Sequence, residues 1–296
     1  MGVEKGKKLT LGGQAVIEGV MIKSVDYYSV AVRNPKNKIS VKSERIDSIF
    51  TNNLFKKPFI RGIFQLAETL VIGIKTLAYS ASESSGEQDE EKISFKEIFF
   101  TMFFAFGFAM LLFVLLPLYL SKLLTSSNGI IFNLIDGIIR IIIFFVYLLL
   151  ISRMNDIKTI FQYHGAEHKA VHCYEHNLPL TVKNVRKYPT LHPRCGTSFI
   201  MIVLIFSILI FSLVSSSNFW IKFLSRVILI PIIAGISYEF LKFFAKYEHN
   251  KFIKIFLYPG LFVQKITTKE PTDKQIEVAI KAVESVLNME RKRKYS

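Results

Sequence analysis

Histidines gather in one part of this 296-residue chain, where their spacing suits metal chemistry. Five of the six, His164, His168, His172, His176 and His192, lie between residues 164 and 192. The first four recur at steps of four residues, and on a helix each such step turns the side chain by only about 40°. His164, His168 and His172 would then form one broad stripe. Two imidazoles four residues apart can hold one ion, and zinc suits such ligands best among the common metals.

The sharpest motif in this stretch is His164-Gly165-Ala166-Glu167-His168, which has the form H-x-x-E-H. This is the zincin signature in reverse order, and it occurs in the inverzincins. In that arrangement the two histidines hold the metal and the adjacent glutamate acts as general base. The motif therefore predicts His164 and His168 as metal ligands and Glu167 as a catalytic residue.

A second segment, His192-Pro193-Arg194-Cys195-Gly196, supplies further candidates. Proline disfavours a helix at the residue before it, so we expect a loop that folds back onto the histidine helix. The third ligand is left open among Glu175, His192 and Cys195. Arg194 is a candidate to stabilise an oxyanion or to bind an anionic substrate group.

A plainer interpretation stands beside this one, because a histidine-rich helix at a membrane surface can simply be a solvated face. We expect His172 and His176, which extend the series beyond the motif, not to be ligands. Cys173 falls on the opposite side of the helix from His164 and is expected to be structural. With only two cysteines the chain has no disulfide framework, which indicates a reducing compartment or a metal role.

Composition indicates that these residues are positioned by a membrane protein. The chain is 51% hydrophobic and 21% charged, too apolar for a disordered chain or an ordinary soluble domain. Four segments reach the roughly 20 residues needed to cross a hydrocarbon core about 30 Å thick. They are residues 98–120, 130–151, 197–214 and 219–244.

The basic residues give an orientation for these segments. Lys and Arg number fifteen in residues 1–97, seven in 153–196 and eleven in 245–296, whereas the turns at the other side hold only Lys122. By the positive-inside rule, both termini and the central loop 153–196 are expected in the cytoplasm of a multi-pass cell-membrane protein. The net charge of +15 is then explained by the membrane, with lipids as partners and no nucleic acid.

The remaining patterns complete a mainly α fold class: four transmembrane helices, an interfacial amphipathic helix and a small N-terminal β-hairpin. We divide the chain into a cytoplasmic region 1–97, a membrane domain 98–244 that contains the loop 153–196, and a cytoplasmic region 245–296. The hairpin is expected at residues 28–33 and 38–44. Amphipathic helices are expected at 59–81 and 273–289, and the Gly-punctuated segment 11–21 as a tight segment under the membrane domain.

At these residues the chain resembles the YqhQ-like family of bacterial membrane proteins, which are described as predicted metal-dependent enzymes. The resemblance implies a metal near His164, Glu167, His168, His192 and Cys195, and it leaves His172 and His176 outside the motif. The matching strings are residues 12–21, Pro58, 61–62, 163–169, Glu175, 184–186, 192–199, 236–239, 259–264, 267–271 and 275–279.

Two functions of different classes follow. The first is a membrane-embedded zinc hydrolase with its site at the cytoplasmic face, for which the location suggests a peptide or lipid substrate. The second is a non-catalytic scaffold or regulator with a structural metal of four protein ligands. A di-iron oxidase needs about eight histidines and ranks low, and a transporter would rest only on Asp136, Arg140 and Glu239. The substrate and the oligomeric state are not determined by the sequence.

Overall fold

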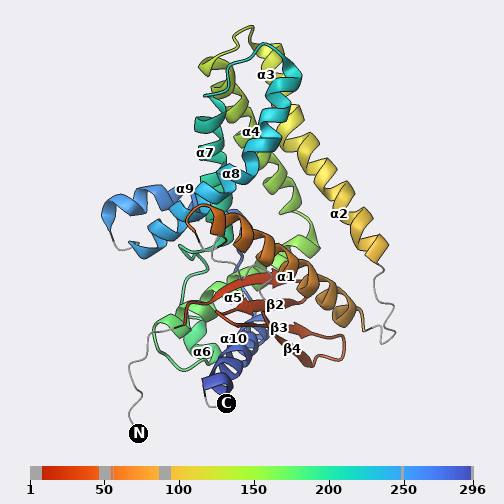
Figure 1. Ribbon diagram of the computed structural model, residues 1–296. Helices are drawn as coiled ribbons and strands as arrows, with labels where there is room; N and C mark the ends of the chain where they lie inside the picture. Colours follow the sequence, from red (N-terminus) through yellow and green to blue (C-terminus); the bar gives the residue numbers. More distant parts are fainter. Residues whose placement is uncertain (1–8, 47–54, 56, 87–94, 248–249, 295–296) are drawn as a thin grey trace.

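The computed structural model describes residues 9–46, 55, 57–86, 95–247 and 250–294. A small antiparallel sheet and the helices packed on it form one part of the molecule, and long apolar helices form the other (Figure 1). The α5 helix (Asn155–Glu175) lies against the sheet and follows directly after α4 (Ile130–Ile151) of the apolar part. The predicted histidine helix is therefore present, at the place where the two parts meet.

The sheet is a meander of four strands in the order β1-β2-β3-β4. Its strands are β1 (Gly12–Val16), β2 (Gly19–Lys23), β3 (Tyr27–Arg33) and β4 (Ile39–Arg45). The expected hairpin is confirmed as β3 and β4. The segment 11–21, expected as a tight segment under the membrane domain, contributes β1 and most of β2. Strands were not predicted there because the glycines hide the alternation of side chains.

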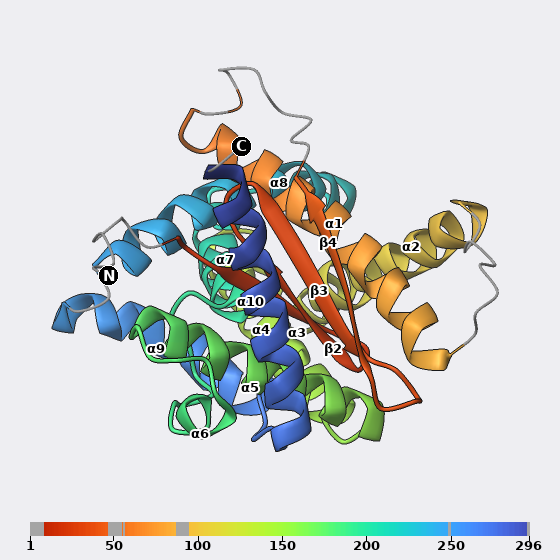
Figure 2. The ribbon, with the colours of Figure 1, turned by 90° about the horizontal axis from the view of Figure 1, so that it is seen from below.

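Both faces of the sheet are covered, which explains the nearly continuous apolar runs in β2 and β3. On one face Val20, Ile22 and Ala31 join a core with α5 and α10 (Asp273–Lys294). On the other face Met21 and its neighbours pack against α1 (Ile60–Ser85). Figure 2 shows α10 crossing the sheet with α5 beside it. This core joins residues from the N-terminal region, the central loop and the C-terminal tail.

The long apolar helices leave this core on the side of α1. Within the described residues, three helices are long and apolar enough to cross a membrane: 100–124, Ile130–Ile151 and Phe219–Lys246. The first is one continuous rod of α2 (Phe95–Met110), a π-helical turn (Leu111–Leu115) and α3 (Leu116–Leu124), and the last is α8. The α7 helix (Gly196–Phe211) is apolar but has 16 residues, about 24 Å of rise.

Two amphipathic helices run longer than expected and a third was not predicted. The α1 helix continues to Ser85 rather than residue 81, and α10 continues to Lys294 rather than residue 289. The α9 helix (Lys251–Thr267) lies in the tail and contains Pro259, a residue that argues against a helix interior when read from sequence. A short helix, α6 (Val182–Val185), follows α5.

Candidate metal centre

The α5 helix presents the histidine motif because its other side is fixed in the core. Tyr163, Ala166 and Ala170 are buried among the sheet and α10. The chain after α9 crosses α5 so closely that a Cβ at Gly165 would lie 2.1 Å from the carbonyl oxygen of Lys269. Glycine is thus required inside the motif, and the crossing segment brings backbone carbonyls next to His164.

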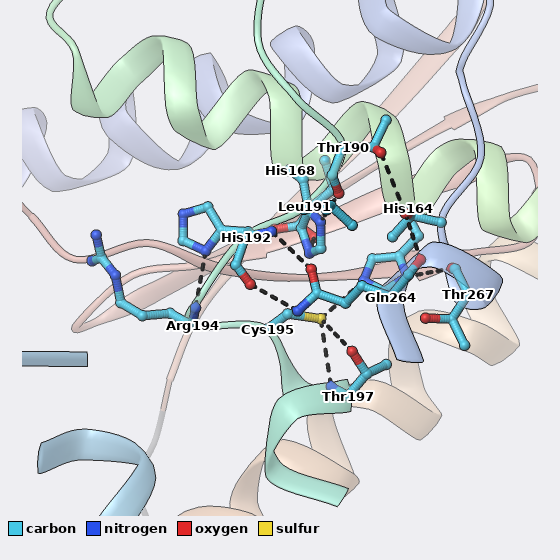
Figure 3. Close-up of polar contacts among 12 residues, drawn as sticks. His164, His168, Thr190, Leu191, His192, Arg194, Cys195, Thr197, Gln264 and Thr267 are labelled. Atoms are coloured by element: carbon cyan, nitrogen blue, oxygen red, sulfur yellow. Dashed lines mark hydrogen bonds and ion pairs between the residues drawn. The ribbon is translucent and has the colours of Figure 1, made fainter. Parts of the chain in front are cut away.

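His164, His168 and Cys195 form a first group whose candidate ligand atoms all lie within 4.8 Å of one another. The His164 Nδ1 is 2.8 Å from the carbonyl oxygen of Thr267, and the His168 Nδ1 contacts that of Thr190 (Figure 3). A carbonyl only accepts, so each Nδ1 carries the hydrogen and each Nε2 keeps its lone pair. This arrangement orients metal-binding histidines in known sites.

Cys195 approaches the two imidazoles from the start of another helix. Its Sγ lies 3.2 Å from the His164 Nε2, and it caps α7 by accepting from the Thr197 backbone N–H at 3.4 Å. The first group therefore brings two imidazole lone pairs and one sulfur to a common point, which is a donor set that zinc accepts.

Glu167 lies beside this group and is almost fully buried. Its Oε2 is 3.5 Å from the His168 Nε2. Burial raises the pKa of Glu167, against the opposing effect of nearby His164 and His192, and burial also lowers the pKa of His168. The carboxylate fits only because β1 has no side chain at Gly13, where a Cβ would lie 2.5 Å from Glu167. The apolar Gly-Gly segment is thus part of the site.

His172, Glu175 and His192 form a second group, with candidate ligand atoms again within 4.8 Å. The Glu175 Oε2 lies 3.3 Å from the His192 Nε2, and its Oε1 lies 2.9 Å from the Arg194 guanidinium. Burial would raise the pKa of Glu175, but the hydrogen bond with His192 and the positive charge of Arg194 lower it overall. Burial lowers the pKa of His172 to about 4.

The His192 loop is fixed by a residue for which the sequence suggested no role. The Gln264 side chain accepts from the His192 backbone N–H and donates to the His192 carbonyl oxygen, both at 2.8 Å (Figure 3). Gln264 is fully buried on α9. A glutamine on an otherwise apolar helix face is the sequence signal that could have indicated such a role, because a buried amide needs hydrogen-bond partners.

The geometry therefore divides the predicted residues between two groups. The first group contains His164, His168 and Cys195, whereas His192 and Glu175 belong to the second. His172, which was not expected to be a ligand, lies in the second group with them. His176 belongs to neither group, and its Nδ1 faces the carbonyl oxygen of His172 at 2.8 Å.

The other polar candidates also find partners. Cys173 is buried in the core, as expected for a structural residue. Glu239 on α8 forms an ion pair with Arg61 of α1. Asp136 and Arg140, four residues apart on α4, form an ion pair at 2.7 Å.

Comparison with known proteins agrees with the resemblance drawn from the motifs. The family model described as "Protein of unknown function (DUF1385)" matches residues 57–289. The "Uncharacterized protein YqhQ" of Bacillus subtilis (strain 168) is 37% identical over 298 residues, which cover 94% of this chain and 92% of that protein. No solved structure matches this chain. The chain belongs to the YqhQ-like family that the DUF1385 model describes.

Proposed function

We propose that this protein is a membrane-embedded, metal-dependent hydrolase whose metal is zinc, held by His164, His168 and Cys195. The proposal rests on one observation: the ligand atoms of His164, His168 and Cys195 lie close together. Each imidazole uses its Nδ1 hydrogen on a backbone carbonyl, so two lone pairs meet a sulfur that has one hydrogen to share. A bound cation satisfies all three atoms at once.

Three protein ligands favour a catalytic site over a structural one. Catalytic zinc commonly has three protein ligands and one open position, whereas structural zinc has four. A zinc ion bound here would supply Lewis acidity to a substrate carbonyl or phosphoryl group. The two histidines would remain neutral, and buried His168, whose pKa is lowered, is suited to that state.

Glu167 is the residue for proton transfer in this proposal. Its Oε2 beside His168 would take a proton from an attacking water molecule and return it to the leaving group. A carboxyl with a raised pKa is a better proton carrier near neutral pH than an exposed glutamate. Arg194, which is partly exposed and paired with Glu175, would bind an anionic part of the substrate.

The membrane setting supports a peptide or lipid substrate. We propose four spans, with α7 as the shortest, and a cytoplasmic site because the basic residues concentrate at the termini and in the loop 153–196. Cys195 stands at the N-terminus of α7, so the site lies at the end of an apolar helix. Exposed Leu70, Val71 and Leu77 on α1 suit a helix that lies at the bilayer surface.

A structural metal in a non-catalytic scaffold is the second candidate. The near-complete burial of His168 and Glu167, 2% and 5% exposed, favours it, because closed structural sites are shielded from water. The two functions differ in what they require of Glu167, which is a base in one and a packing residue in the other.

The first experiment is to measure the metal content of the detergent-purified full-length protein by mass spectrometry. We expect zinc in the wild type, its loss in His164→Ala and Cys195→Ala, and its retention in the matched controls His176→Ala and Cys173→Ala. A wild-type protein that holds no metal after zinc is supplied would contradict the proposal.

The second experiment separates hydrolase from scaffold. Wild type and Glu167→Gln are incubated with membrane lipid extract and with a peptide library, and products are identified by mass spectrometry. Products released by the wild type alone, with equal zinc in both proteins, support the hydrolase. Identical product profiles from both proteins would favour the scaffold.

A further inference from the structure

The second group, His172, Glu175 and His192, lies directly against the first. The ring centroids of His168 and His192 are 5.6 Å apart, and those of His172 and His192 are 4.5 Å apart. His192 therefore stands between a member of the first group and a member of its own. The two groups are adjacent because successive histidines lie on one face of α5 and the loop after residue 190 packs along that face.

We infer that His172, Glu175 and His192 bind a second divalent cation next to the first, so that the protein has a two-metal centre. The inference rests on the proposed function and narrows it to the two-metal class of hydrolase. Nothing in the first group requires a second ion, and the second group has its own complete set of two nitrogen ligands and one oxygen ligand.

Two of the three donor atoms of the second group have a spacing that suits a common metal ion. The His192 Nε2 and the Glu175 Oε2 are 3.3 Å apart, and two such ligands of one tetrahedral zinc ion are about 3.4 Å apart, given bonds of about 2.0–2.2 Å. The His172 Nε2 is 2.9 Å from the carbonyl oxygen of Leu191, so it carries the hydrogen and leaves Nδ1 with the lone pair.

The second position would bind its ion more weakly than the first, for two structural reasons. The Arg194 backbone N–H lies 3.3 Å from the His192 Nδ1, and this long contact must be given up if Nε2 is to hold a metal. The Arg194 guanidinium already neutralises Glu175 at 2.9 Å. A cation must compete with both, and the second position offers no thiolate.

Glu167 connects the two positions. It is buried, contacts His168 of the first group, and is close enough to His192 and Glu175 of the second for their charges to affect it. A carboxylate placed beside two adjacent ions is a common feature of hydrolytic two-metal centres, in which both the attacking and the leaving oxygen are stabilised. Loss of the second ion should therefore reduce hydrolysis without emptying the first position.

The test is a Co²⁺ titration of the chelator-treated, full-length protein in detergent, followed by absorption. Only the first position has a sulfur ligand, so the thiolate-to-cobalt charge-transfer band should saturate at one equivalent. The visible d–d absorption should continue to rise to two equivalents. Glu175→Gln and His172→Ala should keep the first equivalent with its charge-transfer band and lose the second, whereas the control His176→Ala should bind both.

The outcomes separate this inference from the function on which it rests. In one outcome, both absorption bands of the wild type saturate at one equivalent of Co²⁺, and Glu175→Gln behaves in the same way. This result would show that the second group binds no cation, and it would leave the proposed metal site of the first group intact. Failure of the wild type to bind any Co²⁺ would overturn the proposed function itself. If His172→Ala does not fold, as judged by circular dichroism and gel filtration, the isosteric Glu175→Gln decides the question.

Discussion

Two clusters of buried polar residues can be compared in this molecule, and they differ in how their charges are balanced. Among the apolar helices, the Asp136 Oδ2 accepts from Arg140 at 2.7 Å and from Arg226 of α8 at 3.1 Å. Both guanidinium groups also lie over the ring of Phe211. In this cluster the two arginines are therefore balanced by one carboxylate and by the face of an aromatic ring. In the first group on α5, by contrast, two imidazole nitrogens lie beside a single thiol.

The comparison shows that burial of ionisable residues does not by itself indicate a functional site. The ionic cluster has one net positive charge, and the Nε atoms of both arginines lack a hydrogen-bond partner within the described residues. Each of its charged side chains nevertheless has an ionic partner. In the first histidine group the thiol of Cys195 is the neighbour of the His164 Nε2 at 3.2 Å, and one thiol hydrogen cannot serve the lone pairs of both imidazoles. This is the difference from the ionic cluster on which the metal proposal rests.

The largest expected effect comes from breaking the ionic cluster. Asp136→Asn would leave two buried arginines without a counter-ion, and loss of one partner of a buried pair costs about 3–5 kcal/mol of unfolding free energy. The measurement is unfolding in detergent by circular dichroism. Zinc content of the folded fraction should stay unchanged. A variant as stable as the wild type would show that the cluster is not structural.

The next largest expected effect is the stabilisation of the folded protein by bound zinc. Zinc at one hundred times its dissociation constant should stabilise the wild type by about 2.7 kcal/mol, because it binds the native state alone. This increment should vanish in Cys195→Ala and persist in Asp136→Asn, each relative to its own metal-free form. An equal increment in Cys195→Ala would mean that the thiol is not a ligand.

A smaller effect is expected from a variant that shifts the Glu167 side chain but leaves residue 167 itself unchanged. Gly13→Ala would place a Cβ 2.5 Å from Glu167, and such overpacking costs about 1–3 kcal/mol. We expect reduced hydrolysis with zinc retained. Gly12→Ala is the matched control, since a Cβ there meets nothing within 4 Å. Equal activity in the two variants would argue against a role for the position of Glu167.

The smallest effect concerns the loop that carries His192. Gln264→Met keeps the side-chain volume but leaves the His192 backbone N–H without its acceptor, at a cost of about 1–2 kcal/mol. The second equivalent in the Co²⁺ titration should weaken, while the first remains. Weakening of the first equivalent alone would show that Gln264 supports the other position.

The sequence predicted the part of the site that depends on local spacing. His164, Glu167 and His168 lie within one helical turn of one another, so their proximity follows from the helix alone. Cys195 was a candidate because it ends a loop next to an apolar segment. Spacing could not distinguish His172 from His176, because only the return of the loop at Leu191 and His192 places one of them in a group.

Features that depend on distant segments could not be predicted in the same way. The contact of Gly13 with Glu167 joins residues far apart in the chain, and β1 was not identified as a strand. The support of His192 by Gln264 comes from α9, a helix that Pro259 concealed. The long apolar helices were easier to predict, because length and apolar composition identify three of them among the described residues without tertiary information.

The hydrogen bond from His164 to the carbonyl oxygen of Thr267 has a consequence for biosynthesis. The Nδ1 of His164 has this acceptor only after the last residue of α9 has been made and has packed against α5. A nascent or truncated chain that ends before Thr267 carries the whole H-x-x-E-H motif but lacks this acceptor, so under the proposed function it would not retain zinc. Metal retention would then act as a quality check that distinguishes finished molecules from unfinished ones.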